Sequence, residues 1–449
     1  MATTYLTRTS WGTATNKQKF TQSFWVKRGV IGVEQVLLGV ESGGSNEARV
    51  LFKADDTFEF YDYQSVYKFR KITTRKFRDC SAWYNIVLAV DTTHPTGSAR
   101  VNIYINGVQE TSFSTSTDPA QNLNTFYNSS GNHIVQIGRQ STGGSYFTGS
   151  MSHVNFCDGT TLAPTVFGST DATTGEWEGN TSPSVTYGTN GYFILKDGNN
   201  VTDQSGRGNN FTVGGGTLIN LKDNPDNVFA TLNPLMPLGS NIAYSNGNLT
   251  ITPGTSDYKT TASTIAVSSG KFYTEFKAVS GHNGSTDVSI GIVGADTFLA
   301  STGSKAMSAY TDSFSYGSGG LVKKYNGATI RTDATYTNGD IIGIAVDMDN
   351  LKLYWSKNGT FQNSGNPASG STGTGAVLIP SGQPYYICAT TISSGGVKVF
   401  SANFGNGFFG TTAVTTNSGN GYAGAEGASK FNYAVPSGYS ALSTKGLNL

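Results

Sequence analysis

Hydrophobic and polar residues alternate with a period of two in short runs along the chain. The runs "VNIYI" at 101–105 and "LKLYW" at 351–355 show the pattern most clearly. A period of two places one set of side chains on each face of a β-strand. No stretch shows sustained helical periodicity, so we expect helical turns only in connectors such as 160–168. The pattern predicts an all-β protein.

One phrase of this pattern occurs twice. "NIVLAVDTTHPTGSARVNIYINGV" begins at Asn85, and "GIAVDMDNLKLYWSKNGTF" begins at Gly343. Each copy has an apolar run ending in Ala-Val-Asp, a polar turn, and an alternating strand that stops at Asn-Gly. Asn-Gly is a strong hairpin signal because a type I′ turn needs two residues that tolerate positive φ. The repetition predicts two similar β domains, with Trp355 in the core of the second.

Composition supports two sandwiches rather than a disordered chain. The 57 glycines are spread between apolar runs, aromatic residues make up 12%, and charged residues make up only 13%. We expect two tandem antiparallel jelly-roll sandwiches, over residues 1–222 and 228–449, joined by a linker at 223–227. The strands expected in the first domain are Phe20–Lys27, Gln35–Gly39, Ala48–Phe52, Thr57–Tyr61, Trp83–Asp91, Val101–Ile105, His133–Gly138 and Gly149–Phe156.

The distribution of charge argues against a nucleic-acid partner. The chain has 30 basic and 29 acidic side chains, and its one basic cluster runs from Lys68 to Arg78. Nucleic-acid binding normally needs a concentrated positive face, so we expect none, and we interpret the cluster as a solvated strand face or loop. No run is long enough to span a membrane, and no signal peptide is visible. We therefore expect synthesis in a cytoplasm.

Four stretches of the second half resemble a SPRY domain. They are "SGKFYTEFKAVSG", "VSIGIVG", "GDIIGIAVDMDNLKLYWSKNGTF" and "PYYICATTISSGGVKVFSANFG". The resemblance covers most of 268–405 and implies a curved jelly-roll sandwich. The loops at one edge of such a domain form its recognition surface.

The first half resembles the laminin-G or concanavalin A-like lectin/glucanase fold. The matching pieces are "FWVKRG", "WYNIVLAVD" with "VNIYINGV", and "YFTGSMSHVNFCDGTTLAP". The connecting segments, including "FCDGTTLAPTVFGSTDATTGEWEG" and "YGTNGYFILKDGNN", resemble structural proteins of tailed phages of marine bacteria. This second resemblance implies a virion protein, made in the host cytoplasm, that contacts other virion proteins and host-surface glycan. We expect a homo-oligomer, most simply a trimer, since sparse charge suits subunit interfaces, as do the tyrosines on the surface phase of their strands, Tyr61, Tyr63, Tyr104 and Tyr354.

Two groups of aromatic residues are candidates for ligand contact. Tyr61, Tyr63 and Tyr67 lie on the phase opposite Phe58 and Phe60. Their rings are expected either to stack on sugar or to form a subunit interface.

The second group lies in the glycine-punctuated segment 310–327, which we interpret as a recognition loop of the SPRY-like domain. Partly buried turn packing is the alternative. The candidate residues of this segment are Tyr310, Phe314, Tyr316 and Tyr325.

Metal binding and catalysis find little support. Asp203 in "DQSGRGNN" offers either a calcium ligand or a turn cap, and one carboxylate is few for a hard cation. The three cysteines and four histidines show no metal-ligand spacing. A glucanase on this fold needs two carboxylates facing one sugar, and the Glu-x-Asp-x-x-Glu strand is absent.

The sequence thus favours a non-enzymatic virion surface protein, such as an appendage, tail fibre or capsid decoration, that binds host glycan without a cofactor. Two alternatives stay open: a tailspike-like glycan hydrolase, and a purely structural capsid decoration without a ligand.

Overall fold

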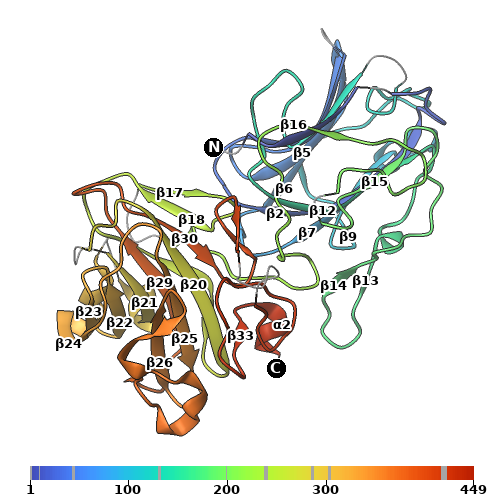
Figure 1. Cartoon of the computed structure of the whole chain (residues 1–449). Helices are drawn as coiled ribbons and strands as arrows, with labels where there is room; N and C mark the ends of the chain where they lie inside the picture. Colours follow the sequence, from blue (N-terminus) through green and yellow to red (C-terminus); the bar gives the residue numbers. More distant parts are fainter. Residues whose placement is uncertain are drawn as a thin grey trace. The chain divides into compact units, whose positions relative to one another are not determined.

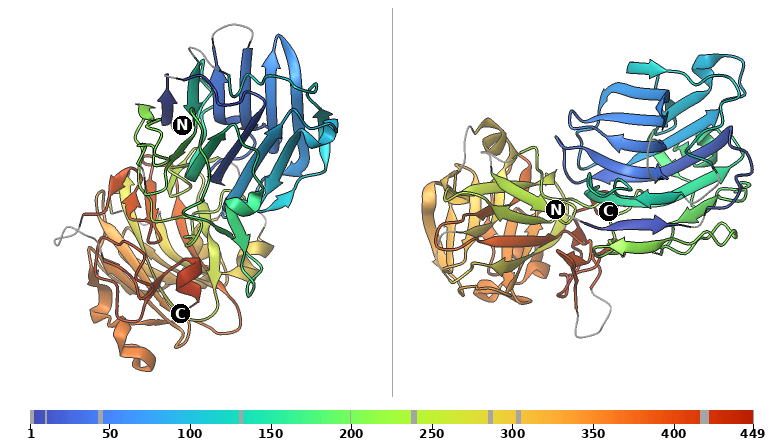
Figure 2. Two further views of the ribbon diagram at one scale, coloured as in Figure 1. Left: turned by 90° about the vertical axis from the view of Figure 1, so that its right-hand side faces the viewer. Right: turned by 90° about the horizontal axis from the view of Figure 1, so that it is seen from above.

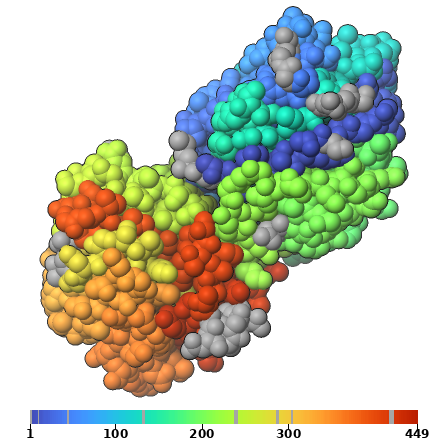
Figure 3. Space-filling view, turned by 45° about the horizontal axis from the view of Figure 1, so that its top comes forward, coloured from blue at the N-terminus to red at the C-terminus, as the bar shows by residue number. Residues whose placement is uncertain are grey.

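The computed structural model divides into two compact units, Met1–Asn220 and Leu221–Leu449. We call them the N-terminal and C-terminal units; in Figure 3 they run from blue to green and from yellow-green to red. The residues that the structure describes are 3–9, 11–42, 46–129, 133–198, 200–236, 241–284, 288–301, 305–415 and 422–448.

The N-terminal unit is built from two antiparallel sheets, which Figures 1 and 2 show from three directions. The eight-stranded sheet has the order β10-β6-β5-β4-β3-β11-β1-β16, and the six-stranded sheet has the order β15-β12-β2-β7-β8-β9. The larger sheet comprises β1 Tyr5–Arg8, β3 Gln35–Glu41, β4 Asn46–Phe52, β5 Thr57–Gln64, β6 Val66–Lys76, β10 Phe113–Thr117, β11 Ile134–Ile137 and β16 Thr212–Gly215. The smaller comprises β2 Lys19–Arg28, β7 Tyr84–Asp91, β8 Val101–Ile105, β9 Val108–Gln109, β12 Gly149–Asp158 and β15 Tyr192–Ile194.

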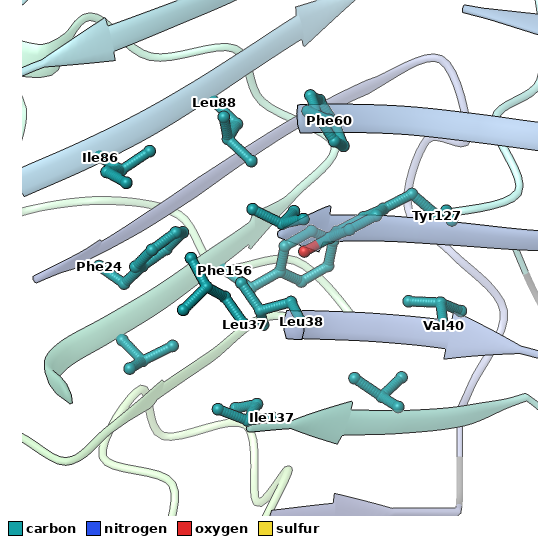
Figure 4. Packing of buried hydrophobic residues seen from close by; sticks show 14 of the residues in the cluster. Phe24, Leu37, Leu38, Val40, Phe60, Ile86, Leu88, Tyr127, Ile137 and Phe156 are labelled. Carbon is teal, nitrogen blue, oxygen red and sulfur yellow. The ribbon is translucent and has the colours of Figure 1, made fainter. Parts of the chain in front are cut away.

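The core of this unit lies between the two sheets. Figure 4 shows Phe24, Ile86 and Leu88 from the smaller sheet packed with Leu38 and Phe60 from the larger. The outer face of the smaller sheet is also covered, because Val87 and Cys157 pack against Phe167 and Tyr187 of the segment that follows β12. That segment contains the short helix η2 Pro164–Val166 and the hairpin β13 Gly168–Thr170 and β14 Trp177–Gly179. The outer face of the larger sheet carries a small cluster in which Tyr61 and Tyr63 pack with Val36 and Leu51.

The C-terminal unit repeats this architecture. Its larger sheet has the order β17-β18-β30-β20-β25-β26-β27, with β28 on β26 and β33 on β20, and its smaller sheet the order β19-β29-β21-β22-β23-β24. The larger comprises β17 Ile242–Ser245, β18 Thr250–Pro253, β20 Lys271–Ser280, β25 Ile341–Asp347, β26 Lys352–Lys357, β27 Thr360–Phe361, β28 Val377–Leu378, β30 Val399–Asn403 and β33 Ser440–Ala441. The smaller comprises β19 Lys259–Val267, β21 Ser289–Gly294, β22 Ser313–Gly317, β23 Leu321–Lys324, β24 Ala328–Thr332 and β29 Tyr385–Thr391. A separate hairpin joins β31 Phe408–Phe409 to β32 Thr412–Ala413.

Both sheets of the C-terminal unit are covered on their outer faces as well. Phe431 and Tyr439 from the last part of the chain pack on Tyr273 and Tyr354 of the larger sheet. On the smaller sheet, Phe298 and Met307 pack against Ala262 and Cys388. These two covering residues belong to the helix α1 Ala295–Ala300 and the short helix η3 Met307–Ala309. The remaining helices are η1 Gly97–Ala99, η4 Tyr325–Gly327, η5 Gln362–Ser364, η6 Pro367–Thr372 and α2 Thr444–Leu447.

The repeated phrase forms the same substructure in both units. β2, β7, β8 and β9 are successive neighbours in one sheet, each paired with the next, and β20, β25, β26 and β27 are arranged in the same way. Asn106 and Gly107 have φ of 49° and 76°, and Asn358 and Gly359 have φ of 50° and 81°. These positive values fit the type I′ turn that Asn-Gly predicts. The all-β sandwich class is confirmed, and Trp355 is fully buried in the second core.

The cluster from Lys68 to Arg78 lies mainly in β6, as the strand-face interpretation expects. Two other expectations about local structure were wrong. The expected loop at 310–327 contains β22 and β23. Tyr354, expected on the surface, is 1% exposed because the end of the chain covers it. Residues 223–227, the expected linker, fall within the C-terminal unit, where an isolated bridge joins Asn224 to Asn227.

Glu275 on β20 fastens the covering segment to the larger sheet of the C-terminal unit. Its carboxylate accepts hydrogen bonds from the backbone N–H of Asn432 at 2.9 Å and of Tyr433 at 2.8 Å, and from the Asn403 side chain at 3.2 Å. The side chain is completely buried. Burial raises the pKa of Glu275 to about 7, against the opposing effect of these hydrogen bonds.

This raised pKa predicts that the C-terminal unit loses stability between about pH 4.5 and 7. Over that range the unfolded chain has released the proton while the folded unit still holds it, so unfolding becomes easier as pH rises. Glu275 changes the free energy of unfolding by roughly 3 kcal/mol over this range. This stability is present in full below the pKa of Glu275 in the unfolded chain, and it is lost as the pH rises through the pKa of Glu275 in the folded unit. Hydrogen exchange of β20 and β25, measured against pH, tests this.

The matched variant is Glu275→Gln, which cannot titrate. The buried His282 has a lowered pKa because of burial and produces the opposite slope, so the difference between the wild-type and Glu275→Gln profiles isolates Glu275. Identical pH profiles for the two proteins would refute the prediction.

Candidate ligand-binding face of the N-terminal unit

Three neighbouring strands bring the predicted tyrosines together on the outer face of the eight-stranded sheet. In the register of β4, β5 and β6, Tyr61 stands between Arg49 and Arg70, and Tyr63 stands between Glu47 and Tyr67. Phe58 and Phe60 point to the opposite face, into the core. The predicted phase of the strand is therefore correct. We call this surface the tyrosine face; it comprises Glu47, Arg49, Glu59, Tyr61, Tyr63, Tyr67 and Arg70.

The three tyrosine rings form one cluster with graded exposure. The ring of Tyr67 lies 5.4 Å from that of Tyr61 and 5.1 Å from that of Tyr63, both edge to face. Tyr67 is 42% exposed, Tyr63 is half-buried, and Tyr61 is 5% exposed. The expectation that Tyr61 is exposed was wrong, because Val36 and Leu51 pack beside it. Tyr61 therefore supports the cluster, while Tyr67 and Tyr63 present it to solvent.

The charged groups of the tyrosine face neutralise one another. Glu47 accepts a hydrogen bond from the Tyr61 hydroxyl at 2.7 Å and pairs with Arg49. Arg70 donates from Nε to Glu59 at 2.6 Å, and its guanidinium lies 4.5 Å over the ring of Tyr67. The hydrogen bond with Glu59 raises the pKa of Arg70. The face thus offers fixed donors and acceptors without a free cation.

The same compensation extends along the basic cluster that begins at Lys68. Lys71 pairs with Asp118 at 2.5 Å, Arg75 with Glu110 at 3.4 Å, and Arg78 with Asp56 at 2.9 Å. A surface on which most cations are already paired has little attraction for a polyanion. The pairing supports the interpretation of this cluster as a strand face without a nucleic-acid partner.

The structure also brings together two carboxylates on neighbouring strands. Glu41 on β3 stands directly opposite Glu47 on β4. Glu41 is 8% exposed, and burial raises its pKa, aided by the nearby charge of Glu47 and opposed by Arg49. A glycosidase needs two carboxylates that both reach the sugar. Here Glu47 is engaged by Tyr61 and Arg49, and Glu41 has little exposed surface.

The second predicted group of aromatics lies mostly in the core of the C-terminal unit. Tyr310, Phe314 and Tyr316 are at most 1% exposed, so they have no surface to offer a ligand. Tyr325 is half-buried and packs edge to face on Phe314, with ring centroids 5.7 Å apart. The segment corresponds to the packing alternative rather than to a recognition loop.

Asp203 is occupied as a turn cap. One carboxylate oxygen accepts the backbone N–H of Phe193 and Ser205, and the other accepts the Ser205 hydroxyl and the backbone N–H of Asn209, all at 2.8–2.9 Å. These four bonds correspond to the turn-capping alternative. Among the residues that the structure describes, no group of three or more His, Cys, Asp or Glu side chains could hold a metal ion. None of the helices within that part of the chain has the length and apolarity needed to cross a membrane.

Sequence reasoning found the tyrosines but missed their polar partners. Arg49 and Glu47 belong to a different strand, and only the register places them beside Tyr61 and Tyr63. Alternating charge in "NEARV" was the one available signal.

A family model matches the part of the chain that forms the tyrosine face. Residues 2–167 match the family model of the concanavalin A-like lectin/glucanases superfamily. The match includes β1 to β12, and hence every strand of the tyrosine face. It supports the predicted resemblance of the first half. None of the curated proteins matches the chain in sequence.

Solved structures with related folds include SPRY domains and carbohydrate-binding proteins. The SPRY domain of human HERC1 is 18% identical, with a TM-score of 0.31, over 38% of this chain and 96% of that chain. A candidate carbohydrate-binding protein from Bacteroides ovatus is 18% identical, with a TM-score of 0.34, over 47% of this chain and 56% of that chain. Domain 4 of AbnA, a GH43 extracellular arabinanase from Geobacillus stearothermophilus solved with arabinotriose, is 17% identical, with a TM-score of 0.26, over 33% of this chain and 64% of that chain. These likenesses concern the fold.

Proposed function

We propose that this chain is a non-enzymatic glycan-binding protein whose tyrosine face holds the sugar. The observation that carries the proposal is the exposed ring of Tyr67, flanked by Tyr63 and by the Arg70–Glu59 pair, on an open sheet of a lectin-like unit. Sugars present flat C–H surfaces that pack on aromatic rings, and hydroxyl groups that hydrogen-bond with fixed planar groups. A rigid, amphipathic tyrosine supplies contact area at a low cost in conformational entropy.

The pairing of charges indicates that the preferred glycan is neutral. Both guanidinium groups of the tyrosine face already have carboxylate partners, Glu47 for Arg49 and Glu59 for Arg70. An anionic sugar would have to compete with these carboxylates and would meet the further charge of Glu41 if that group is ionised. A neutral sugar can use the remaining donors and acceptors without breaking an ion pair.

We expect Tyr67→Ala to weaken binding of the preferred neutral oligosaccharide by at least about tenfold, since a central aromatic contact typically carries more than about 1 kcal/mol. Calorimetry with oligosaccharides selected on a glycan array measures this. Tyr67→Phe is the matched control, because it keeps the ring and should bind within about threefold of wild type. Binding should also change little between low and high salt, since a neutral sugar forms no ion pair with the protein.

Absence of binding to every glycan on the array would refute the proposed function, and so would full affinity in Tyr67→Ala. Tight binding to sulfated or uronate glycans that weakens steeply with salt and is lost in Tyr67→Ala would contradict the neutral preference of the tyrosine face alone.

The proposed setting is the surface of a phage particle. The support is the resemblance of the connecting segments to structural proteins of tailed phages, together with the order of a lectin-like and a SPRY-like domain. In this proposal the chain is made in the host cytoplasm, assembles as a homo-oligomer, most simply a trimer, and contacts other virion proteins. The burial of Tyr61 and Tyr354 removes two of the tyrosines expected at a subunit interface. A mass measurement of the purified protein tests the oligomer.

A glycan hydrolase is the second candidate function. It is favoured by the position of Glu41 directly opposite Glu47 on the neighbouring strand. The binding experiment separates the two functions if reducing ends are measured in the same incubation. The proposal expects no new reducing ends. Release of reducing ends that disappears in Glu41→Gln would establish the hydrolase instead.

A further inference from the structure

The C-terminal unit contains a groove that is separate from the tyrosine face. Its volume is about 310 Å³, at the lower end for small-ligand sites. Three segments line it: β20 and the start of β25, the β31–β32 hairpin, and residues 422–433. The residues that matter for its chemistry are Lys277, Phe409, Thr412, Tyr422, Asn432 and Tyr433.

The base of the groove is apolar. Ile341, Phe409 and Val414 form a small buried cluster, each at most 7% exposed, and Tyr433 packs against it. Because this cluster joins β25 to the β31–β32 hairpin, the hairpin is held against the sheet. The groove therefore has a fixed apolar base on which the flat side of a ring can rest.

One wall of the groove is held in place by hydrogen bonds. The backbone N–H groups of Asn432 and Tyr433 donate to the buried carboxylate of Glu275, and the Asn432 side chain accepts from the backbone N–H of Thr415 at 3.2 Å. Paired backbone hydrogen bonds between Tyr422 and Phe431, at 2.9 and 2.7 Å, bring Tyr422 to the same side. These hydrogen bonds fix the backbone of Tyr422 and Tyr433 before a ligand arrives. Such a preorganised surface lowers the entropy cost of binding.

The rim combines hydroxyl groups with an uncompensated cation. Thr412 and Thr415 are exposed, and Tyr422 is 36% exposed. Lys277 is half-buried, and no described carboxylate lies within the 4.0 Å ion-pair distance of its ammonium group. The tyrosine face differs, because both of its guanidinium groups are paired. A ligand here gains most if it carries an anionic group as well as hydroxyls.

We propose that this groove is a second saccharide site, specific for a sugar that carries a carboxylate. One ring rests on Tyr433, which packs on the buried Phe409. The hydroxyls of the sugar bond with Thr412 and Asn432, and its carboxylate pairs with Lys277. The volume holds one or two sugar rings and is too small for a helix or a paired strand. The inference does not depend on the function proposed for the tyrosine face.

The test is titration of the full-length protein with tetragalacturonate, a hyaluronan tetrasaccharide and sialyllactose, with binding measured by calorimetry and ligand-observed NMR. Lys277→Gln should weaken the tightest of these by about tenfold to a hundredfold, the usual effect of losing a hydrogen bond to a charged group. Thr412→Val should weaken it by a smaller factor without removing the cation. Lys323→Gln, which changes a half-buried lysine on β23, and Tyr67→Ala, on the other unit, are controls that should bind as wild type does.

Two results would overturn the inference. The first is absence of binding to all three saccharides, or binding that neither Lys277→Gln nor Thr412→Val affects. The second is an acidic peptide, such as tetraglutamate, that binds the groove more tightly than any of the saccharides, which would assign the site to protein. Loss of binding in Tyr67→Ala would place the acidic sugar on the tyrosine face and would also contradict the inference.

Discussion

Replacing Asp56 by alanine is expected to lower the free energy of unfolding of the N-terminal unit by about 3–5 kcal/mol. Asp56 lies 3.2 Å from Arg28, and the two side chains are 3% and 0% exposed. Asp56 also accepts the backbone N–H of Gly32 at 2.7 Å and pairs with Arg78 at 2.9 Å. These contacts outweigh the effect of burial and lower the pKa of Asp56. Without Asp56, a fully buried guanidinium loses its counter-charge.

The double variant Arg28→Met/Asp56→Ala is the control for this prediction. Arg28 lies 4.4 Å over the ring of Phe52, a position that a methionine side chain can also fill. Removing both charges should restore much of the lost stability, because an apolar replacement carries no desolvation cost. Hydrogen exchange of β2 and β5 measures both variants. If Asp56→Ala costs less than about 1 kcal/mol, the charge of Arg28 does not depend on this carboxylate.

Trp355→Ala is expected to destabilise the C-terminal unit by about 3–5 kcal/mol, the usual cost of truncating a buried aromatic residue. Trp355 is fully buried, its Nε1 donates to the carbonyl of Ile290 at 3.2 Å, and its ring lies 6.3 Å from that of Tyr316. The indole thus joins β26 of one sheet to β21 and β22 of the other. Its removal leaves a cavity between the sheets and an unpaired carbonyl.

Leu378→Ala provides the matched control, since Leu378 is a large apolar residue of the same unit that is 67% exposed. It should change the free energy of unfolding by no more than about 0.5 kcal/mol. Calorimetric unfolding and hydrogen exchange of β21 and β26 compare the two variants. Equal stability of Trp355→Ala and Leu378→Ala would contradict the placement of Trp355 in the core.

The strands that the sequence predicts best are those with one face in the core and a clear turn signal. "VNIYI" buries Val101, Ile103 and Ile105 in strict alternation and ends at Asn106-Gly107, so both its type and its end could be predicted. The segment 310–327 could not, because α1 and η3 cover the outer face of that sheet and both phases of β22 are buried. Its glycines and serines then suggest a loop. The hydroxyl of Tyr316 favours a surface position in the sequence. In the structure that hydroxyl donates a hydrogen bond to the carbonyl of Ala334, and the side chain is buried.

The candidate site, too, could be predicted only in part from the sequence. The phase of β5 follows from the sequence, so Tyr61 and Tyr63 could be assigned to the outer face. How far each tyrosine is exposed depends on neighbouring strands, since Val36 and Leu51 bury Tyr61. The pairing of Arg49 with Glu47, and of Arg70 with Glu59, depends on register and side-chain packing, which one sequence does not reveal.

The most direct test of the central claim is a crystal structure of the full-length protein with the neutral oligosaccharide that binds it most tightly. We predict that a sugar ring packs on the exposed side of Tyr67, next to Tyr63, with its hydroxyls hydrogen-bonded to the Arg70–Glu59 pair. The ion pairs of the tyrosine face should remain intact. An oligosaccharide bound elsewhere on the chain, with Tyr67 and Arg70 untouched, would contradict the account.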